Sequence, residues 1–244
     1  MSELAEAPVG EVVFPGQTLC KLPSSGQLRL GPGLQTQAET VCTIKSGILH
    51  KTKTGKLWVE GRQKRYIPAV EESVIGIITQ KYGENFDVDI GGPFTATLPV
   101  LAFEGATRRK TGPKSTGVSV AFQVGDLVYA RVTAAERDLD PVLACTDAQG
   151  KSSGFGQLKE GSLITSNTHY ARRLLSRPPC PVLAALEKHL KQYEVAVGLN
   201  GKIWVNSPSI ARTVIACNAI QRAEFMSSAQ TELLVSKLVD VAQS

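Results

Sequence analysis

The chain has 244 residues, of which 42% are hydrophobic and 20% are charged. This length allows two or three small cores, and the composition is that of a folded protein rather than a disordered one. The 27 Lys and Arg residues outnumber the 22 Asp and Glu residues, which gives a net charge of +5 and favours a polyanionic partner without requiring one. No apolar run approaches the ~18 residues of a membrane span, and the acidic N-terminus lacks a secretory signal. We therefore expect an intracellular, soluble protein.

The cysteines give no sign of a metal site or a disulfide framework. They are Cys20, Cys42, Cys145, Cys180 and Cys217. They are odd in number, widely scattered and far in sequence from the three histidines, and no C-x-x-C pair occurs. This pattern predicts buried free thiols in a reducing compartment.

Residues 1–70 are predicted to form a small β domain. Short apolar runs alternate with glycine and proline, which is typical of strands joined by turns. The expected strands are 12–14, 28–30, 41–44, 48–50, 57–59 and 66–68. The apolar residues are so scattered that the module has little room for its own core, which suggests docking on a neighbouring protein. Seven basic residues and one acid, Glu60, lie between Lys45 and Tyr66, and they form either a polyanion site or a solvated face.

Residues 71–149 are predicted to form five strands. These are 74–79, 86–90, 94–98, 127–132 and 142–145. Their number and spacing indicate an OB-type barrel, a fold that binds oligonucleotides across one open face. The long connection after the third strand carries a basic cluster of Arg108, Arg109, Lys110 and Lys114. Such flexible cations suit contacts with phosphates that do not depend on base sequence, although a solvated surface is the alternative.

Residues 150–244 are predicted to be an α+β region. Helices are expected at 169–176, 182–192, from an N-cap at Ser207 to about Phe225, and from Ser227-Ser228 onward. Periodicity assigns eight inward side chains to the last two helices. They are Ile210, Val214, Ile215, Ala219, Leu233, Leu234, Leu238 and Val241.

Between the second and third of these helices lies the tetrad Gly198-Leu199-Asn200-Gly201, which has the form G-x-x-G. In KH domains a G-x-x-G loop clamps single-stranded nucleic acid, and such a clamp needs a helix–loop–helix setting. Here the flanking residues are β-branched and aromatic, and they prefer strands. Asn-Gly between such runs favours a hairpin with a type I′ turn, which pairs Leu199 with Lys202 and Val197 with Trp204. We predict that Gly198, Asn200 and Gly201 form a structural turn.

Several motifs together resemble a known family. VIGIITQKYGENFDVDIGG, LAFEGATRRK, QVGDLVYARV and GLNGKIWV, in this order, and QKRYIP before them are similar to the RNA exosome cap subunits called ribosomal RNA-processing protein forty. The resemblance spans nearly the whole chain and implies three domains. They are an N-terminal β domain (1–70), an S1-type OB barrel (71–149) and a variant KH domain (150–244) whose tetrad serves structure.

The resemblance also implies a function. It describes a non-catalytic subunit that sits on a ring of RNase-PH-like proteins beside other cap subunits, in the nucleus, nucleolus and cytoplasm. Such a subunit guides single-stranded RNA, largely independent of sequence, towards a separate 3′-to-5′ nuclease for rRNA processing and RNA degradation. The alternative is a free-standing OB/KH RNA-binding protein outside any stable assembly.

The family's S1 domain faces the central pore at the stretch that matches FEGATRRK, so RNA contacts are expected there. The residues assigned to RNA in this loop are Arg108, Arg109, Lys110 and Lys114. Lys81 and Tyr82, at the first turn of the barrel, are also assigned to RNA, where they would add charge and a stacking surface; the alternative is a solubilising charge and an ordinary turn aromatic. Lys64 and Arg65 contact either RNA or a neighbouring subunit. Ordinary S1 domains often present Phe and His for stacking, but residues 94–103 hold no His, which favours electrostatic tracking.

Catalysis is not predicted. A metal-dependent nuclease needs three or four converging carboxylates, whereas the sequence offers only two pairs, Asp87 with Asp89 and Asp138 with Asp140. Such pairs are typical of strand edges and turns. No Walker pattern and no G-x-S-x-G motif occurs, so no cofactor, metal or nucleophile is expected.

Overall fold

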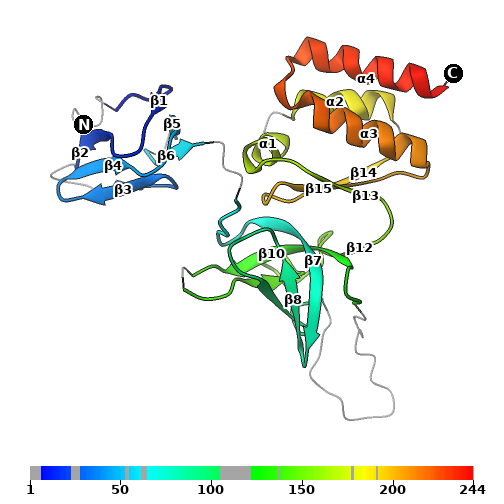
Figure 1. Cartoon of the computed structure of the whole chain (residues 1–244), viewed down its shortest axis with the longest axis horizontal. Coiled ribbons are helices and arrows are strands. Elements are labelled where there is room, and N and C mark those ends of the chain that lie inside the picture. Colours follow the sequence, from blue (N-terminus) through cyan, green and yellow to red (C-terminus); the bar gives the residue numbers. More distant parts are fainter. Residues whose placement is uncertain are drawn as a thin grey trace. The chain divides into compact units, whose positions relative to one another are not determined.

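A computed structural model describes residues 7–22, 28–52, 55–61, 65–104, 122–136, 138–176, 179–190 and 192–243, with side chains described as far as residue 240. The chain divides into two compact units, Met1–Gln63 and Lys64–Ser244 (Figure 1). No helix in the described part of the chain is long and apolar enough to cross a membrane.

The N-terminal unit contains two three-stranded antiparallel sheets. One has the order β1-β5-β6 and the other β2-β4-β3. The strands are β1 (Val12–Val13), β2 (Thr18–Lys21), β3 (Leu34–Gln37), β4 (Thr40–Thr43), β5 (Gly47–Lys51) and β6 (Leu57–Glu60). Residues 28–30 are not a strand, and only an isolated bridge joins Leu30 to Leu57. Residues 66–68 are not a strand either.

This unit has a core of its own, so the prediction that it lacks room for one is wrong. Val13, Val41, Leu49 and Leu57 are each fully buried in one cluster. The missed strands β2 (TLCK) and β3 (LQTQ) lack alternation, since β2 has two adjacent apolar residues between polar ends and β3 has one leucine followed by three polar residues. Their buried Leu19 and Leu34 nevertheless complete the cluster, since a short strand needs only one inward side chain to cover a small core.

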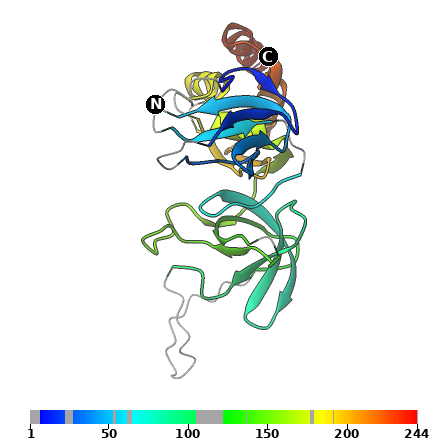
Figure 2. The ribbon, with the colours of Figure 1, turned by 90° about the vertical axis from the view of Figure 1, so that its left-hand side faces the viewer.

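The predicted five-stranded OB-type barrel is confirmed. Its strands are β7 (Ser73–Tyr82), β8 (Asn85–Asp89), β9 (Ala96–Pro99), β10 (Leu127–Ala134) and β11 (Val142–Ala144). Antiparallel pairings join β7 to β8, β8 to β9, β10 to β7 and β11 to β10, and a parallel pairing of β11 with β9 closes the ring (Figure 2). A further strand, β12 (Gly156–Leu158), pairs with β10.

Alternation along the strands builds the barrel core. On β8, Phe86 and Val88 point inward and are fully buried, whereas Asp87 and Asp89 lie on the outer face. Tyr66, which precedes the first barrel strand, is also buried in this core, and its hydroxyl donates to Glu72 Oε2 at 2.8 Å. Burial raises the pKa of the Tyr66 phenol above its usual range.

The C-terminal region is α+β, as predicted. Its elements are β13 (Ser162–Thr165), α1 (Thr168–Leu174), α2 (Pro181–His189), β14 (Glu194–Val197), β15 (Lys202–Asn206), α3 (Ile210–Arg222), the 3-10 turn η2 (Ala223–Phe225) and α4 (Ser228–Gln243). The sheet order is β13-β15-β14, and α2, α3 and α4 cover one side of it (Figure 1). Val197, Ile203 and Val205 pack against these helices in a second core.

The faces of the last two helices agree only in part with the predicted ones: Ile215 and Ala219 are buried and Leu238 packs against the core, as predicted, but other positions differ. Helix α3 begins after Ser209 rather than Ser207, whose hydroxyl donates instead to the Gln192 carbonyl at 2.9 Å. Ile210 and Val214 are exposed, because the buried stripe is centred on small residues that allow close packing. That stripe comprises Thr213, Ile215, Ala216, Cys217, Ala219 and Ile220.

Helix α4 shows a similar shift. Leu233 is exposed, and Val235 and Val239 are buried in its place. Apolar residues occur on several sides of both helices, so periodicity alone does not select the face that packs. The side chain of Val241 lies outside the described residues.

Candidate nucleic-acid interface

The tetrad forms the predicted hairpin, but with a different turn. The Gly198 N–H donates to the Lys202 carbonyl at 2.9 Å, and the Gly201 N–H donates to the Gly198 carbonyl at 3.0 Å. Val197 lies opposite Ile203 and Ala196 opposite Trp204, so the predicted pairing of Val197 with Trp204 is wrong by one residue. Gly201 has a φ of +82°, whereas Asn200 is not among the described residues with positive φ. This is a three-residue loop with glycine at its left-handed position, not a type I′ turn.

The Asn200 side chain attaches this turn to the barrel. It is buried, its Nδ2 donates to the carbonyls of Ile75 and Ile90 at 2.8 Å each, and its Oδ1 accepts from the Ile75 N–H at 3.3 Å. The neighbouring Leu199 N–H donates to the Ser73 carbonyl at 2.8 Å. A carboxamide alone among neutral side chains supplies two donors and an acceptor in this arrangement. The polar groups of Asn200 are therefore bonded inside the protein rather than offered to a phosphate.

The two glycines of the tetrad are required by close packing. A Cβ at position 198 would lie 2.3 Å from Asn200 Oδ1 and 2.7 Å from the Ile75 nitrogen. A Cβ at position 201 would lie 2.5 Å from the Ser166 carbonyl oxygen. The helix–loop–helix setting that a clamp needs is found elsewhere, between α1 and α2, where residues 175–180 read LSRPPC and contain no glycine.

Ion pairs surround the same contact. Lys202 Nζ lies 3.0 Å from the Asp89 carbonyl oxygen and 3.5 Å from Asp89 Oδ2. Arg172, at the end of α1, donates to Glu72 Oε1 at 2.9 Å, and Glu72 also accepts from Tyr66. Sequence reasoning missed these pairs because each joins residues that are distant along the chain. Asp89, one of the two carboxylates of the Asp87–Asp89 pair, is thus paired with the ammonium group of Lys202.

Within the described part of the chain, no group of three or more His, Cys, Asp or Glu side chains is arranged to hold a metal ion. All five cysteines lie in that part and are buried, as predicted, with free thiols. Burial raises the pKa of the Cys145 thiol from 9.0 to about 12, and it also raises the pKa of Cys20 and Cys217.

Lys81 and Tyr82 lie at the solvent-facing end of the β7–β8 hairpin. Tyr82 is 76% exposed, and Lys81 Nζ lies 5.4 Å from the centroid of the Phe86 ring. The connection of the first two strands is one of the loops with which OB folds bind oligonucleotides. The positions of both side chains therefore suit RNA contact, which stays a prediction.

The other residues expected to contact RNA or a neighbouring subunit are Arg65, Lys64 and the basic cluster 108–114. Arg65 is exposed. Lys64 and the basic cluster Arg108, Arg109, Lys110 and Lys114 lie outside the described residues.

Three protein-family models match consecutive parts of the chain. The exosome complex exonuclease Rrp40 N-terminal domain matches residues 28–65, the S1 domain of exosome complex component RRP40 matches 66–156, and a KH domain matches 161–211. Exosome complex component rrp40 of Schizosaccharomyces pombe is 41% identical over 93% of this chain and 94% of its own length. The chain belongs to the exosome complex component RRP40 family. The Homo sapiens RRP40 is 34% identical over 98% of this chain and 86% of its own length.

A solved structure resembles the chain in three dimensions. A crystal structure of a protein assigned as an exosome complex RNA-binding protein has a TM-score of 0.59 and 25% identity, and the match covers 73% of this chain and 97% of that one. The RRP40 S1 match begins at Tyr66, which is buried in the barrel core, and the KH match includes the whole tetrad. The S1 match thus begins at a residue of the barrel core, and the KH match contains the turn that contacts the barrel.

Proposed function

We propose that this RRP40 family member is a non-catalytic RNA-binding cap subunit of the RNA exosome. It sits with other cap subunits on the ring of RNase-PH-like proteins and guides single-stranded RNA to a separate 3′-to-5′ nuclease, in the nucleus, nucleolus and cytoplasm. The observation that carries the proposal is near-full-length identity of 34–41% to proteins named exosome complex component RRP40. The solved structure assigned as an exosome complex RNA-binding protein supports the RNA-binding part.

The charges on the barrel indicate where RNA contact is best placed. The outer face of β8 carries Asp87 and Asp89, and carboxylates repel a phosphate backbone. Lys81 and Tyr82 at the hairpin end, and the basic cluster 108–114 in the long connection, carry the cations and the exposed aromatic ring that a single strand needs. RNA therefore contacts the ends of the barrel strands rather than the middle of the β8 face.

The absence of catalysis is part of the proposal, although the matching N-terminal family is named for an exonuclease. Asp89 is paired with Lys202, and a carboxylate held by an ammonium group is a weaker ligand for a catalytic metal. A purified full-length chain should leave a labelled single-stranded RNA intact in Mg²⁺. Shortening of the RNA that disappears in Asp87→Asn with Asp89→Asn would contradict the proposal.

The RNA-binding part is tested by the salt dependence of affinity. Each phosphate contact on a single strand contributes about −0.7 to the slope of log K against log salt, so Arg108→Ala with Arg109→Ala and Lys110→Ala should reduce its magnitude by about 2. A matched control replaces three cations of α3 and α4, Arg212, Arg222 and Lys237, with Ala and should change it less. An unchanged slope in the first variant would place RNA elsewhere.

Assembly is tested separately. Size-exclusion chromatography with and without purified RNase-PH-like exosome subunits should show a larger complex that contains this chain. A chain that stays monomeric and gains no thermal stability from those subunits would favour the free-standing OB/KH alternative.

A further inference from the structure

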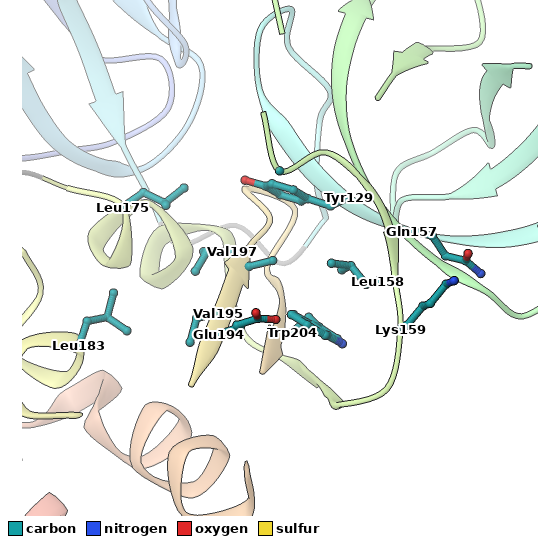
Figure 3. Close-up of a pocket in the computed structure, with 12 residues that line it drawn as sticks. Tyr129, Gln157, Leu158, Lys159, Leu175, Leu183, Glu194, Val195, Val197 and Trp204 are labelled. Carbon is teal, nitrogen blue, oxygen red and sulfur yellow. The ribbon is translucent and has the colours of Figure 1, made fainter. Parts of the chain in front are cut away.

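A groove with a volume of about 670 Å³ follows the outer edge of strand β14. All four residues of β14 line it. Leu175 and Leu183 contribute from the helix side, Trp204 comes from β15, and Tyr129 and Leu158 come from the barrel (Figure 3). The groove is thus shared by the two domains of the second unit.

The backbone of β14 is available for pairing along this groove. The strand pairs with β15 on one side, and among the described strands it has no other partner. Because the Gly198 N–H donates to β15, the alternation of an antiparallel ladder directs the N–H and C=O groups of Val195 and Val197 away from β15. The next outward N–H, that of Leu199, donates to Ser73 at the start of β7. The outer edge of the hairpin is therefore already bonded to the β7 backbone at Leu199. At Val195 and Val197 no described strand pairs with it.

The sequence of β14 protects the open edge only at its start. Natural edge strands are guarded by short length, charged side chains, proline or a bulge. EVAV is four residues long and carries one charge, Glu194, but it contains no lysine, proline or bulge. The apolar remainder of this edge lies beside an apolar groove, which is the arrangement to which an extended peptide adds a strand.

The groove offers apolar contacts on both sides of the edge. Leu183 lies on one side of β14, and Trp204 and Leu158 lie on the other (Figure 3). Successive side chains of an added strand point to opposite faces, so an alternating apolar segment would place residues against both sets. The indole ring of Trp204 is held in place beside the groove, since its Nε1 donates to the Glu160 carbonyl at 2.9 Å.

The charge of the groove distinguishes a peptide from RNA. Among the described lining residues only Lys159 and Glu194 are charged, and they are opposite in sign. Affinity for a phosphate backbone comes mainly from an excess of cations, which the groove lacks. The geometry points to a protein segment: we infer that an extended, alternately apolar segment of a partner protein adds a strand to β14 in this groove.

The first test selects ligands without assuming their sequence. A phage-displayed library of random ten-residue peptides is panned against the full-length chain, and selected peptides are synthesised and measured by fluorescence anisotropy. We expect enrichment of peptides with apolar residues at alternate positions. N-methylation of alternate backbone nitrogens removes the donors without changing the side chains, and it should abolish binding.

The chain offers a matched pair of variants. Leu175 lines the groove and Leu233 lies on α4 away from it, and both are exposed leucines, so neither Leu175→Glu nor Leu233→Glu should unfold the protein. Leu175→Glu should weaken peptide binding by about tenfold or more, because it places a charge against an apolar contact. Leu233→Glu should leave the affinity unchanged.

Amide exchange of the wild-type chain provides a measurement that needs no variant. Bound peptide should slow exchange at Val195 and Val197, whose N–H groups face the groove, but not at Ala196, which already bonds to β15.

Several results would overturn the inference. They are a selection without the alternating pattern, binding that survives N-methylation, and protection at Ala196 alone. If Leu175→Glu instead weakens binding of a ten-nucleotide oligouridylate, the groove is an RNA site. If it dissociates a dimer, the occupant is a second copy. Failure of the peptide inference would leave the cap-subunit proposal standing, because that proposal is tested separately by the salt slope and by assembly.

Discussion

Among single residues, Asn200 does most to join the KH region to the barrel. Its carboxamide makes three hydrogen bonds to backbone groups of Ile75 and Ile90, which are 125 and 110 positions away along the chain. Ile75 is fully buried yet belongs to neither hydrophobic core, so it lies in the contact that this side chain completes. Buried backbone groups that lose such a partner are left without water to replace it.

Asn200→Ala should therefore destabilise the protein strongly. Leaving up to three buried backbone groups unpaired predicts a loss of about 2–4 kcal/mol in the free energy of unfolding. Urea titration followed by circular dichroism measures this loss. Asn218→Ala, on the partly exposed side of α3, is the matched control and should change stability by less than about 0.5 kcal/mol. Equal effects of the two variants would contradict the structural role of Asn200.

The buried thiol of Cys145 predicts a dependence of stability on alkaline pH. Burial raises its pKa from 9.0 to about 12, so the folded chain retains a proton that the unfolded chain releases. The contribution is fully present below pH 9 and is lost as the pH rises from about 9 to 12, at about 1.4 kcal/mol per pH unit.

Cys145→Val keeps an apolar side chain of similar size and removes this titration. The difference in unfolding free energy between wild type and Cys145→Val should be constant from about pH 7 to 8.5 and should shift against the wild type above pH 9. Other alkaline groups, including Tyr66, cancel in the difference. A difference that stays flat up to pH 10.5 would show that the thiol is accessible in the folded chain.

At the scale of elements, local pattern was enough to predict the strands of the barrel, but not β2 and β3 of the N-terminal unit, which lack it. Alternation in Phe86-Asp87-Val88-Asp89-Ile90 is enough to predict β8 and its inward face. The hairpin at the tetrad is also predictable, but its register is not, because it depends on the backbone conformation of Asn200 that the barrel holds in place. The inward faces of α3 and α4 were predicted only in part for a different reason: apolar residues on several sides of these helices allow more than one face to pack.

The candidate interface also has one part that the sequence predicts and one part that it does not. The sequence shows that the tetrad is a turn and that cations gather in the long connection of the barrel. The groove beside β14 has no signal in the sequence, because its lining residues come from six separate segments and each is ordinary in its own surroundings.

The turn itself can be tested by comparing glycines. Gly198→Ala and Gly201→Ala place a Cβ within 2.3 and 2.5 Å of Asn200 Oδ1 and the Ser166 carbonyl, so the hairpin or the barrel must move. Gly83→Ala in the β7–β8 turn also has a positive φ, but no atom lies within 4 Å of its Cβ. Gly83→Ala should lose about 1–2 kcal/mol from backbone strain, and the tetrad variants should lose more than that. Thermal unfolding of the three variants side by side measures the difference, and equal losses would mean that the close contacts are easily relieved.

At the scale of the second unit, two separate hydrophobic cores are joined by a polar contact. One core lies in the barrel and the other lies between the KH sheet and its helices. The connection consists of Asn200, the pair of Lys202 with Asp89, and the pair of Arg172 with Glu72. Hydrogen bonds and ion pairs depend on the relative positions of their atoms. The unfolding of the two cores is therefore coupled only while these contacts are intact.

We therefore expect the barrel and the KH region to unfold as one cooperative unit in the wild type and as two units when the contact is broken. Asn200→Asp removes both donors and sets a carboxylate against two carbonyl oxygens, while Lys202→Met keeps the apolar stem and removes the charge. Native-state hydrogen exchange reports the opening free energies of Val88 in the barrel and Ala216 in the KH region. These opening free energies should agree in the wild type and separate by at least about 1 kcal/mol in the double variant.

The control is Lys188→Met, which breaks only an exposed pair with Glu232 and should leave the two opening free energies equal. Opening free energies that already differ in the wild type would show that the polar contact does not couple the two domains.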